Sequence, residues 1–351
     1  MSLDLTADLP DLLMAITDIE SVSGNEGPLA DAVGAALSAL PHLTVDRDGD
    51  ALVARTTQGK GTRVVIAGHL DTVPVASNLP SWREGDRIHG RGTCDMKGGV
   101  AVMLAAAAEL VAPRHDVTWI FYDNEEVEAV RNGLGRLSRT RPELISGDFA
   151  VLMEPTGARI EGGCQGTLRF EVTARGTAAH SARAWLGHNA IHDAGVLLRT
   201  LADHEPRIVE VDGLEYREGL NAVGITGGIA GNVIPDQCTI TVNFRFAPDR
   251  SLEDAKEYCR ALFPGHELVF TDESPAARPG LDRPAAAEFL AAVGGEPRAK
   301  YGWTDVARFS ALGVPAVNFG PADPGKAHTD DEFCPVADLH TCHDALLRWL
   351  G

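Results

Sequence analysis

Three short apolar runs in the first half of the chain each end in His, Asp or Glu residues. The runs span residues 64–67, 117–122 and 150–153, and their β-branched and aromatic content predicts buried strands of an α/β sheet. The polar residues that follow them are His69 and Asp71, then Glu125 and Glu126, then Glu154. Parallel strands place their carboxyl ends at one edge of a sheet, where ligands of open α/β sheets bind. We therefore expect these side chains to gather in one cleft.

A fourth acidic position, Asp95, lies in the segment GRGTCDMKGG at residues 90–99, just ahead of a predicted helix over residues 100–110. Taken alone, Asp95 is better explained as a plain helix cap, and an acid pair such as Glu125 and Glu126 is usually a solvated surface face. Directly after buried strands, however, crowded carboxylates are costly without a cation. The pattern as a whole favours a metal site.

Nitrogen and carboxylate ligands without thiolates suit zinc or a similar first-row ion. The six cysteines form no CxxC pair, which is typical of reduced thiols rather than of a thiolate zinc site. A carboxylate that bridges two divalent ions is a known device for hydrolysis, and an unligated carboxylate beside it can move a proton from water to a leaving amine. If two divalent ions occupy the cleft, with zinc as the expected metal and Co²⁺ as an alternative in one site, the scissile group is an amide or ester.

The pattern changes near residue 166. The predicted elements then follow the order βαββαβ, at residues 167–175, 189–204, 220–228, 238–246, 251–263 and 268–271. We interpret this unit as a domain inserted into the first one, with a Pro-rich return at residues 273–284. The expected domains are 1–165 with 280–351, and 166–279. The predicted fold class is α/β, with a mostly parallel sheet flanked by helices and a ferredoxin-like inserted domain.

The charge balance excludes several classes of partner. Lys and Arg total 31 against 50 Asp and Glu, a formal net charge of −19, so we expect neither nucleic-acid nor anionic-membrane binding. The first ten residues are acidic and show no secretory signal, and the mostly apolar stretch at 99–112 is too short to span a bilayer. We expect a cytoplasmic protein.

Five ordered motifs, AGHLDTVP, GRGTCDMKGG, NEE, MEPT and AHTDDE, resemble those of the dinuclear zinc amidohydrolase family, which includes desuccinylases, deacetylases, aminoacylases and carboxypeptidases. The resemblance spans almost the whole chain. It implies that His69 and Glu154 bind one zinc ion, that Glu126 and His328 bind the other, and that Asp95 bridges them. It further implies that Glu125 is the catalytic acid and base and that Asp71 orients His69. Val127 and Glu128 depart from the small residue that commonly follows the paired glutamates, which leaves the ligands intact.

The same resemblance implies a substrate-binding set. Its members are His180, often supplied by a partner subunit, Asn232, Arg245, Thr304 and Arg308. The run YGWTDVARF at residues 301–309 resembles the actinobacterial type of the desuccinylase branch. Two arginines favour a substrate with a second carboxylate, since a succinyl group carries one and an acetyl group does not.

The implied reaction is hydrolysis of the amide of N-succinyl-diaminopimelate, a small N-acyl amino acid, in lysine biosynthesis. An acetylornithine deacetylase, or another N-acyl amino acid hydrolase or dipeptidase, is the first alternative. A metal-dependent binding protein without turnover is the second, and Glu125 argues against it because a binder has no use for that carboxylate. The resemblance also implies a homodimer formed through the inserted lid domain.

Overall fold

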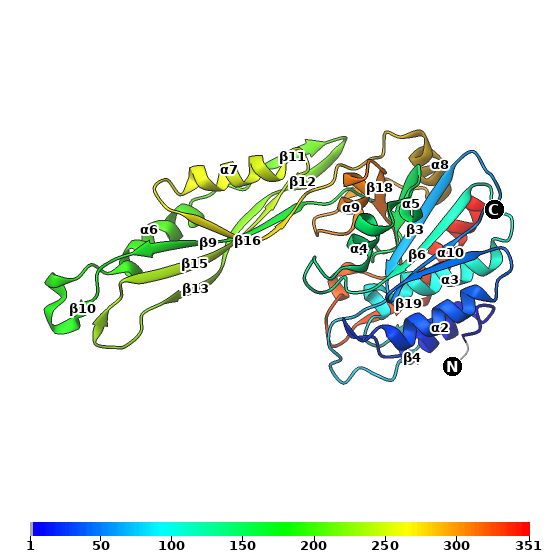
Figure 1. The fold of residues 1–351 in the computed structure, drawn as a ribbon, viewed down its shortest axis with the longest axis horizontal. Helices are drawn as coiled ribbons and strands as arrows, with labels where there is room; N and C mark the ends of the chain where they lie inside the picture. The colour runs from blue at the N-terminus through cyan, green and yellow to red at the C-terminus, as the bar shows by residue number, and fades with distance from the viewer. Residues whose placement is uncertain (1–2) are drawn as a thin grey trace. The chain divides into compact units, whose positions relative to one another are not determined.

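The computed structural model describes residues 3–351, which form two compact units (Figure 1). Unit 1 comprises Met1–Gly162 as far as it is described, Pro279–Arg298 and Asp305–Gly351. Unit 2 comprises Gly163–Arg278 and Ala299–Thr304. Residues 299–304 thus group with unit 2, whereas the sequence analysis assigns them to the flanking domain.

Unit 1 is built on an eight-stranded sheet in the order β1-β2-β6-β3-β7-β18-β8-β17. The strands are β1 (Thr44–Asp48), β2 (Ala51–Arg55), β3 (Arg63–His69), β6 (Asp116–Tyr122), β7 (Phe149–Leu152), β8 (Glu161–Gly162), β17 (Arg298–Ala299) and β18 (Ala316–Asn318). The four central strands, β6, β3, β7 and β18, run parallel, while β1, β2 and β8 pair antiparallel. The turn residues Asp48, Gly49 and Asp50 predict a β-hairpin, and β1 and β2 form it.

Helices cover both faces of this sheet, which explains why its central strands are continuous apolar runs. The helices of unit 1 are α1 (Leu9–Thr17), α2 (Gly27–Ser38), α3 (Gly98–Glu109), α4 (Gly133–Thr140), α5 (Pro142–Ile145), α8 (Pro284–Val293), α9 (Val306–Ala311) and α10 (Val336–Leu350). One face packs in a core with α1, α3, α8 and α10, to which Ile66, Trp119 and Val151 contribute. On the other face Val65, Ile120 and Ala150 are also buried, and α5 and α9 contact β6 and β7.

A small antiparallel sheet of unit 1 was not anticipated. Its order is β19-β5-β4, with β4 (Trp82–Glu84), β5 (Arg87–His89) and β19 (Phe333–Pro335). The polar sequence between Pro74 and Gly90 predicts an irregular stretch, and this prediction is wrong at residues 82–89. These strands have three residues each, too few to show an alternating pattern, and β5 pairs with a strand from the far end of the chain.

Unit 2 carries a four-stranded antiparallel sheet in the order β13-β15-β9-β16. The strands are β9 (Gly166–Arg175), β13 (Gly219–Gly227), β15 (Gln237–Phe246) and β16 (Leu268–Ser274), and the helices are α6 (Ala190–Ala202) and α7 (Leu252–Leu262). Alternate residues such as Phe170, Val242 and Phe244 form its core with both helices. Ser251 caps α7 in a capping box with Asp254, as its sequence predicts.

Two further pairings in unit 2 lie outside the predicted βαββαβ order. One is β10 (Ala179–His180) with β14 (Val233–Ile234), and the other is the hairpin of β11 (Ile208–Val211) with β12 (Leu214–Arg217). The hairpin turns at Asp212 and Gly213, which both have positive φ. An Asp-Gly pair between apolar residues is a strong hairpin signal, so this element was predictable. The observed architecture confirms the predicted fold class.

All six cysteines lie within the described residues, and each is a buried free thiol. Among residues 3–351, none of the helices combines the length and the apolar character needed to cross a bilayer.

Candidate metal centre

The carboxyl ends of β3, β6 and β7 meet at one edge of the unit 1 sheet. His69, the last residue of β3, pairs in register with Tyr122, the last residue of β6. Ala67 of β3 pairs with Leu152 at the end of β7. The segments that follow these strands, which carry Asp71, Glu125, Glu126 and Glu154, therefore start from one edge.

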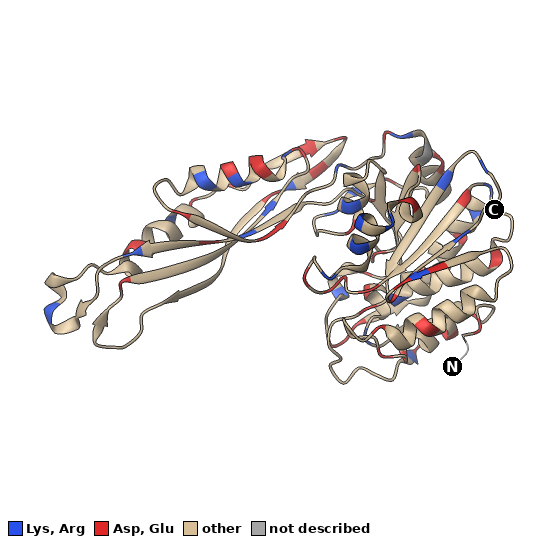
Figure 2. Cartoon of the chain, viewed as in Figure 1, with Lys and Arg blue, Asp and Glu red and all other residues tan. Residues whose placement is uncertain are grey.

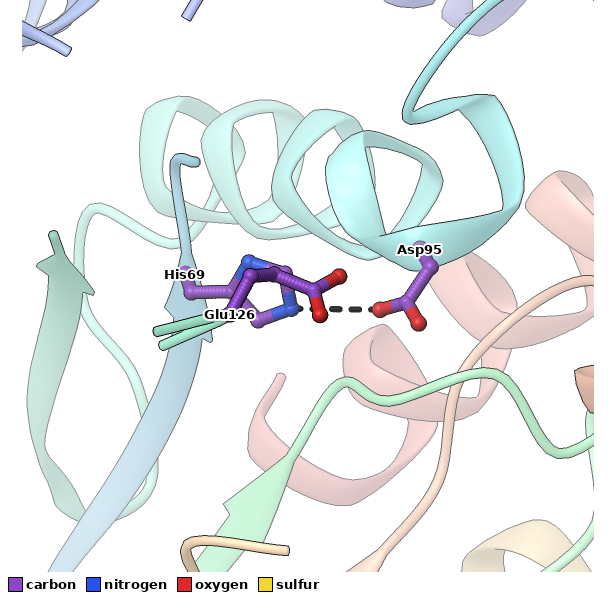
Figure 3. Close-up of side chains that lie close together, drawn as sticks. All are labelled: His69, Asp95 and Glu126. Carbon is purple, nitrogen blue, oxygen red and sulfur yellow. Dashed lines mark hydrogen bonds and ion pairs between the residues drawn. The ribbon is translucent and has the colours of Figure 1, made fainter. Parts of the chain in front are cut away.

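Three of the predicted ligands form a cluster at this edge (Figure 3). One ligand atom each of His69, Asp95 and Glu126 lies within 4.8 Å of the other two. His69 Nε2 is 3.1 Å from Asp95 Oδ1. His328 joins the cluster from a loop near the end of the chain, with its Nε2 2.8 Å from Glu126 Oε1 and 3.4 Å from Asp95 Oδ2. Asp95 thus lies between two imidazoles and offers one oxygen to each.

The position of Asp95 follows from the turn Thr93–Lys97, which leads into α3. The backbone of Asp95 and Met96 in this turn is not helical. The side chain of Asp95 therefore lies ahead of the regular helix, which starts at Gly98. The expected place of Asp95, ahead of the helix start, is confirmed.

The charges of the cluster are those of a cation site. Burial lowers the pKa of His69, but its contacts with Asp71 and Asp95 outweigh this and hold the pKa well above the ordinary value. Hydrogen bonds with Asp95 and Glu126 raise the pKa of His328 to about 10. Both imidazoles thus lie in a region of concentrated negative charge. Two imidazoles and several carboxylates, close together and partly buried, fit divalent zinc or a similar ion.

Asp71 is fully buried, and its carboxylate accepts hydrogen bonds from two distant segments of the chain. Its Oδ1 accepts the backbone N–H of Glu125 at 2.9 Å, and its Oδ2 accepts that of Glu126 at 3.0 Å and the hydroxyl of Ser23 at 2.7 Å. Nδ1 of His69 lies 3.0 Å from the backbone carbonyl oxygen of Asp71 and 3.5 Å from the same Oδ1. Asp71 therefore fixes both the imidazole and the backbone of the paired glutamates.

Glu125 is half-buried and Glu154 is buried, and neither belongs to the three-residue cluster of His69, Asp95 and Glu126. The charges of His69, Glu126 and Glu154 act on Glu125. Burial raises the pKa of Glu125 well above its ordinary value, and the carboxylates of Asp305, Glu154 and Glu126 raise it further. His69 acts in the opposite direction. A carboxyl group with a raised pKa at the edge of a cation site has the character of a proton carrier.

The predicted substrate-binding residues of unit 2 lie at two ends of its sheet. His180 and Asn232 are exposed beside the β10–β14 pair, where the N–H of Ser181 donates to the Asn232 carbonyl at 2.9 Å. Arg245 is at the other end of β15, and burial lowers its pKa. Arg245 lies eight positions after Gln237 in β15, and Gln237 pairs with the end of β9 that leads to β10. The two ends are about 27 Å apart at 3.4 Å per residue, so His180 does not meet Arg245 within this sheet.

Thr304 is buried in unit 2, where its carbonyl accepts a contact from the thiol of Cys164 at 3.7 Å. Arg308 lies in α9 of unit 1. Its Nε donates to the buried carboxylate of Asp305, which also accepts the Asn132 amide at 2.9 Å. The guanidinium of Arg308 is thereby held in one orientation.

Four residues around the cluster were not singled out by the sequence analysis. Arg91 and Lys97 lie within GRGTCDMKGG and Glu332 ends AHTDDE, so the motifs themselves contained the signal, while Ser23 had none. Lys97 is buried, and its Nζ donates to the carbonyl of Ile16 in α1 at 3.2 Å and to that of Ile19, just after this helix, at 2.9 Å. Burial lowers the pKa of Lys97 to about 7.

Comparison with known proteins places this site in a family. The model of peptidase family M20/M25/M40 matches residues 65–351. The chain is 52% identical to a protein of Mycobacterium tuberculosis named putative succinyl-diaminopimelate desuccinylase DapE, over 99% of both chains. It is 46% identical to the succinyl-diaminopimelate desuccinylase of Corynebacterium glutamicum, over 99% of this chain and 98% of that protein.

Solved structures share the fold at low sequence identity. Aminopeptidase PepT of Bacillus cereus matches with a TM-score of 0.80 and 17% identity, over 99% of this chain and 98% of that one. The YXEP protein of Bacillus subtilis, described as a dinuclear metal binding peptidase, matches with a TM-score of 0.73 and 17% identity, over 97% and 96%.

Proposed function

The chain belongs to peptidase family M20/M25/M40, and from this membership we propose that it is a dinuclear zinc amidohydrolase that cleaves N-succinyl-LL-2,6-diaminopimelate to succinate and LL-2,6-diaminopimelate. The observation that carries the proposal is the near full-length identity, 52% and 46%, to two proteins named as desuccinylases of this substrate. The cluster of His69, Asp95, Glu126 and His328 supports it, because that cluster supplies the donors a hydrolytic metal pair needs. The reaction belongs to lysine biosynthesis.

Five residues would hold the two zinc ions. We assign His69 and Glu154 to one ion, Glu126 and His328 to the other, and Asp95 to both. The placement of Asp95 between His69 and His328 supports its bridging role. When bound, such ions lower the pKa of water and polarise a carbonyl group, which is the chemistry that amide hydrolysis requires.

Glu125 is proposed to take a proton from the attacking water and to give one to the leaving amine. Its backbone N–H is held by Asp71, so the position of the side chain is set from a buried anchor. Its half-buried place among other carboxylates favours proton uptake, as the raised pKa indicates. Asp71 itself acts on the orientation of His69 and of the loop that carries Glu125.

The succinyl carboxylate and the α-carboxylate of the substrate need cationic partners in a chain with an excess of acidic residues. We assign Arg308 and Arg245 to these two groups, with the hydroxyl of Thr304 as a further donor. Arginine suits this role because its planar fork binds a carboxylate through two hydrogen bonds. The anchoring of Arg308 on Asp305 supports a fixed binding orientation.

We further propose that unit 2 forms a homodimer through β13. This strand is at an edge of its sheet, and residues 221–227 are exposed. Figure 2 shows no charged residue on β13, although charges commonly protect a free edge. Val223 and Ile225 of β13 are 59% and 52% exposed, and Val196 on α6 is 69% exposed. A second copy of the chain would cover this apolar edge.

The dimer gives His180 and Asn232 a role. Because they lie at the opposite end of the unit 2 sheet from Arg245, we propose that these two residues act on the substrate bound by the partner copy. Substitution of Ile225 by Lys tests the dimer, with Val269→Lys on the opposite edge strand β16 as the matched control. Light scattering after gel filtration is expected to show a monomer for Ile225→Lys alone, with lower turnover. A dimeric Ile225→Lys variant would contradict this interface.

We place the reaction in the cytoplasm. The six buried free thiols support a reducing compartment. Hydrolysis of the succinyl compound by the purified protein, compared with N-acetylornithine, tests the proposed substrate. Turnover of the acetyl compound alone would identify an acetylornithine deacetylase instead, and metal-dependent binding without product would identify a binding protein.

A further inference from the structure

Two segments that carry proposed zinc ligands are joined by a buried ion pair. Arg91 precedes Asp95 by four residues, and Glu332 follows His328 by four. Nη1 of Arg91 lies 2.8 Å from Oε2 of Glu332, and their side chains are 4% and 1% exposed. The pair therefore connects segments about 240 positions apart in the sequence, both within unit 1.

Glu332 contacts the backbone of the Asp95 turn directly. Its Oε1 accepts the N–H of Cys94 at 3.0 Å and that of Asp95 at 3.1 Å. Both carboxylate oxygens of Glu332 thus have partners. Oε1 accepts backbone N–H groups of the Asp95 turn, and Oε2 pairs with the guanidinium of Arg91. Hydrogen bonds to a buried charged group are among the stronger ones in proteins.

Arg91 extends the connection to the other segment. Its Nη1 also donates to the carbonyl of Thr329 at 3.3 Å, directly after His328, and its Nε donates to the carbonyl of Pro74 at 3.0 Å. Arg91 thereby holds the loop after β3 and the loop of His328 at once. The pair is formally neutral, so it fixes these loops without adding net charge to the carboxylate cluster.

We propose that Arg91 and Glu332 are positioning residues that hold the Asp95 turn against the His328 loop, so that a divalent ion finds both ligands already in place. The inference rests on the proposed zinc site and deepens it. Neither residue is assigned a contact with zinc or substrate. Their effect passes through the backbone of Asp95 and of Thr329, as is common for groups that orient metal ligands.

Zinc affinity, measured without substrate, tests the pair. Glu332→Gln keeps the size of the side chain but removes the charge, and its amide cannot accept hydrogen bonds from both sides as the carboxylate does. Competition with a chelating dye is expected to show a 10- to 100-fold weaker affinity for at least one of the two zinc ions. Asp331→Asn is the matched control, because Asp331 is the neighbouring acid in the same loop, is 69% exposed and pairs with the side chain of Lys326.

One readout separates positioning from a general loss of stability. Excess zinc is expected to restore most of the turnover of Glu332→Gln with KM close to that of the wild type, which a general loss of the fold would not allow. The melting temperature of the metal-free variant is expected to fall, because Arg91 is left buried without its charged partner. Should Glu332→Gln fail to fold, Arg91→Lys takes its place, since lysine keeps the charge but cannot reach Glu332, Thr329 and Pro74 together.

Wild-type zinc affinity in the folded variant, or lost turnover that excess zinc does not restore, would overturn the inference. The proposed reaction fails separately: a wild-type protein that binds two zinc ions but leaves N-succinyl-diaminopimelate intact would refute the substrate and not the positioning pair.

Discussion

The carboxylate of Asp71 accepts the backbone N–H of Glu125 at 2.9 Å. Asp71 lies two residues beyond the end of β3 and Glu125 three residues beyond the end of β6, so one hydrogen bond fixes how the two strand ends are joined. The second oxygen of Asp71 accepts the N–H of Glu126. The proposed proton carrier and a proposed zinc ligand therefore share one buried anchor.

Replacement of Asp71 by Asn removes part of this anchor. Asn has a single acceptor oxygen, so one of the two backbone N–H groups loses its partner, and the added amide donors face other donors. We expect zinc affinity and kcat to fall 10- to 100-fold. Ser23→Ala, which removes only the hydroxyl donor to Asp71, is expected to change both by less than tenfold. Zinc titration and steady-state kinetics check this, and equal effects of the two substitutions would argue against the anchor.

Glu125 and Glu126 are adjacent, yet their substitutions are expected to differ. Glu125→Gln should retain two zinc ions per chain while kcat falls about 10²- to 10⁴-fold, because a proton carrier is lost. Glu126→Gln should lose zinc as well, since Glu126 belongs to the cluster with His69 and Asp95. Metal analysis of the dialysed proteins beside their kinetics distinguishes the two. Full activity of Glu125→Gln would remove Glu125 from the mechanism.

Arg308 offers a test of substrate recognition. Arg308→Lys keeps the positive charge but loses the planar fork and the hydrogen bond from Nε to Asp305. We expect KM for the succinyl substrate to rise about tenfold, equivalent to about 1.4 kcal/mol, with a smaller change in kcat. Arg139→Lys, at an exposed position of α4, serves as control. An unchanged KM in Arg308→Lys would mean that Arg308 does not bind a carboxylate of the substrate.

Asp116 lies at the start of β6, at the other end of this strand from the proposed zinc ligands. We expect this residue to make the stability of the fold depend on pH. Burial raises its pKa, but the N–H groups of Gln58 and Lys60 at 2.8 and 2.9 Å, with Thr56 and Arg63, outweigh this and hold the pKa below 3.8. A carboxyl group with a lowered pKa stabilises the fold at pH values above its pKa in the unfolded chain. This contribution is lost as the pH falls through the pKa of the group in the folded protein.

We therefore expect Asp116→Asn to lower the free energy of unfolding at pH 7 by about 1–3 kcal/mol, and the difference from the wild type to shrink below pH 3.8. Urea unfolding at a series of pH values measures it. Asp86→Asn, at a side chain that is 84% exposed, is expected to have little effect. A difference that grows toward acid pH would contradict the assignment.

The sequence predicted the elements whose signal is local. β3, β6 and β7 are apolar runs that end in charged residues, and this combination indicated both the sheet and its functional edge. The β4–β5–β19 sheet carried no such signal, because its pairing joins three-residue strands from distant segments. The hairpin at Asp212 and Gly213 did carry one and was overlooked.

The same distinction holds for the site. The motifs and the strand order predict that the side chains of His69, Asp95 and Glu126 lie close together, and in the structure they do. The motif AHTDDE contains Glu332, but the contacts of this residue could not be predicted from the motif, since a glutamate in an acidic loop is usually solvated. Only the fold reveals that it is buried against the backbone of Asp95.

The central claim is zinc-dependent cleavage of a succinyl amide, and one assay tests it most directly. Purified protein is incubated with N-succinyl-LL-2,6-diaminopimelate or N-acetylornithine, untreated, after chelation, and after zinc is restored. We expect turnover of the succinyl compound that chelation abolishes and zinc restores, with little turnover of the acetyl compound. Turnover of the acetyl compound alone, or cleavage of the succinyl compound that survives complete removal of metal, would contradict the account.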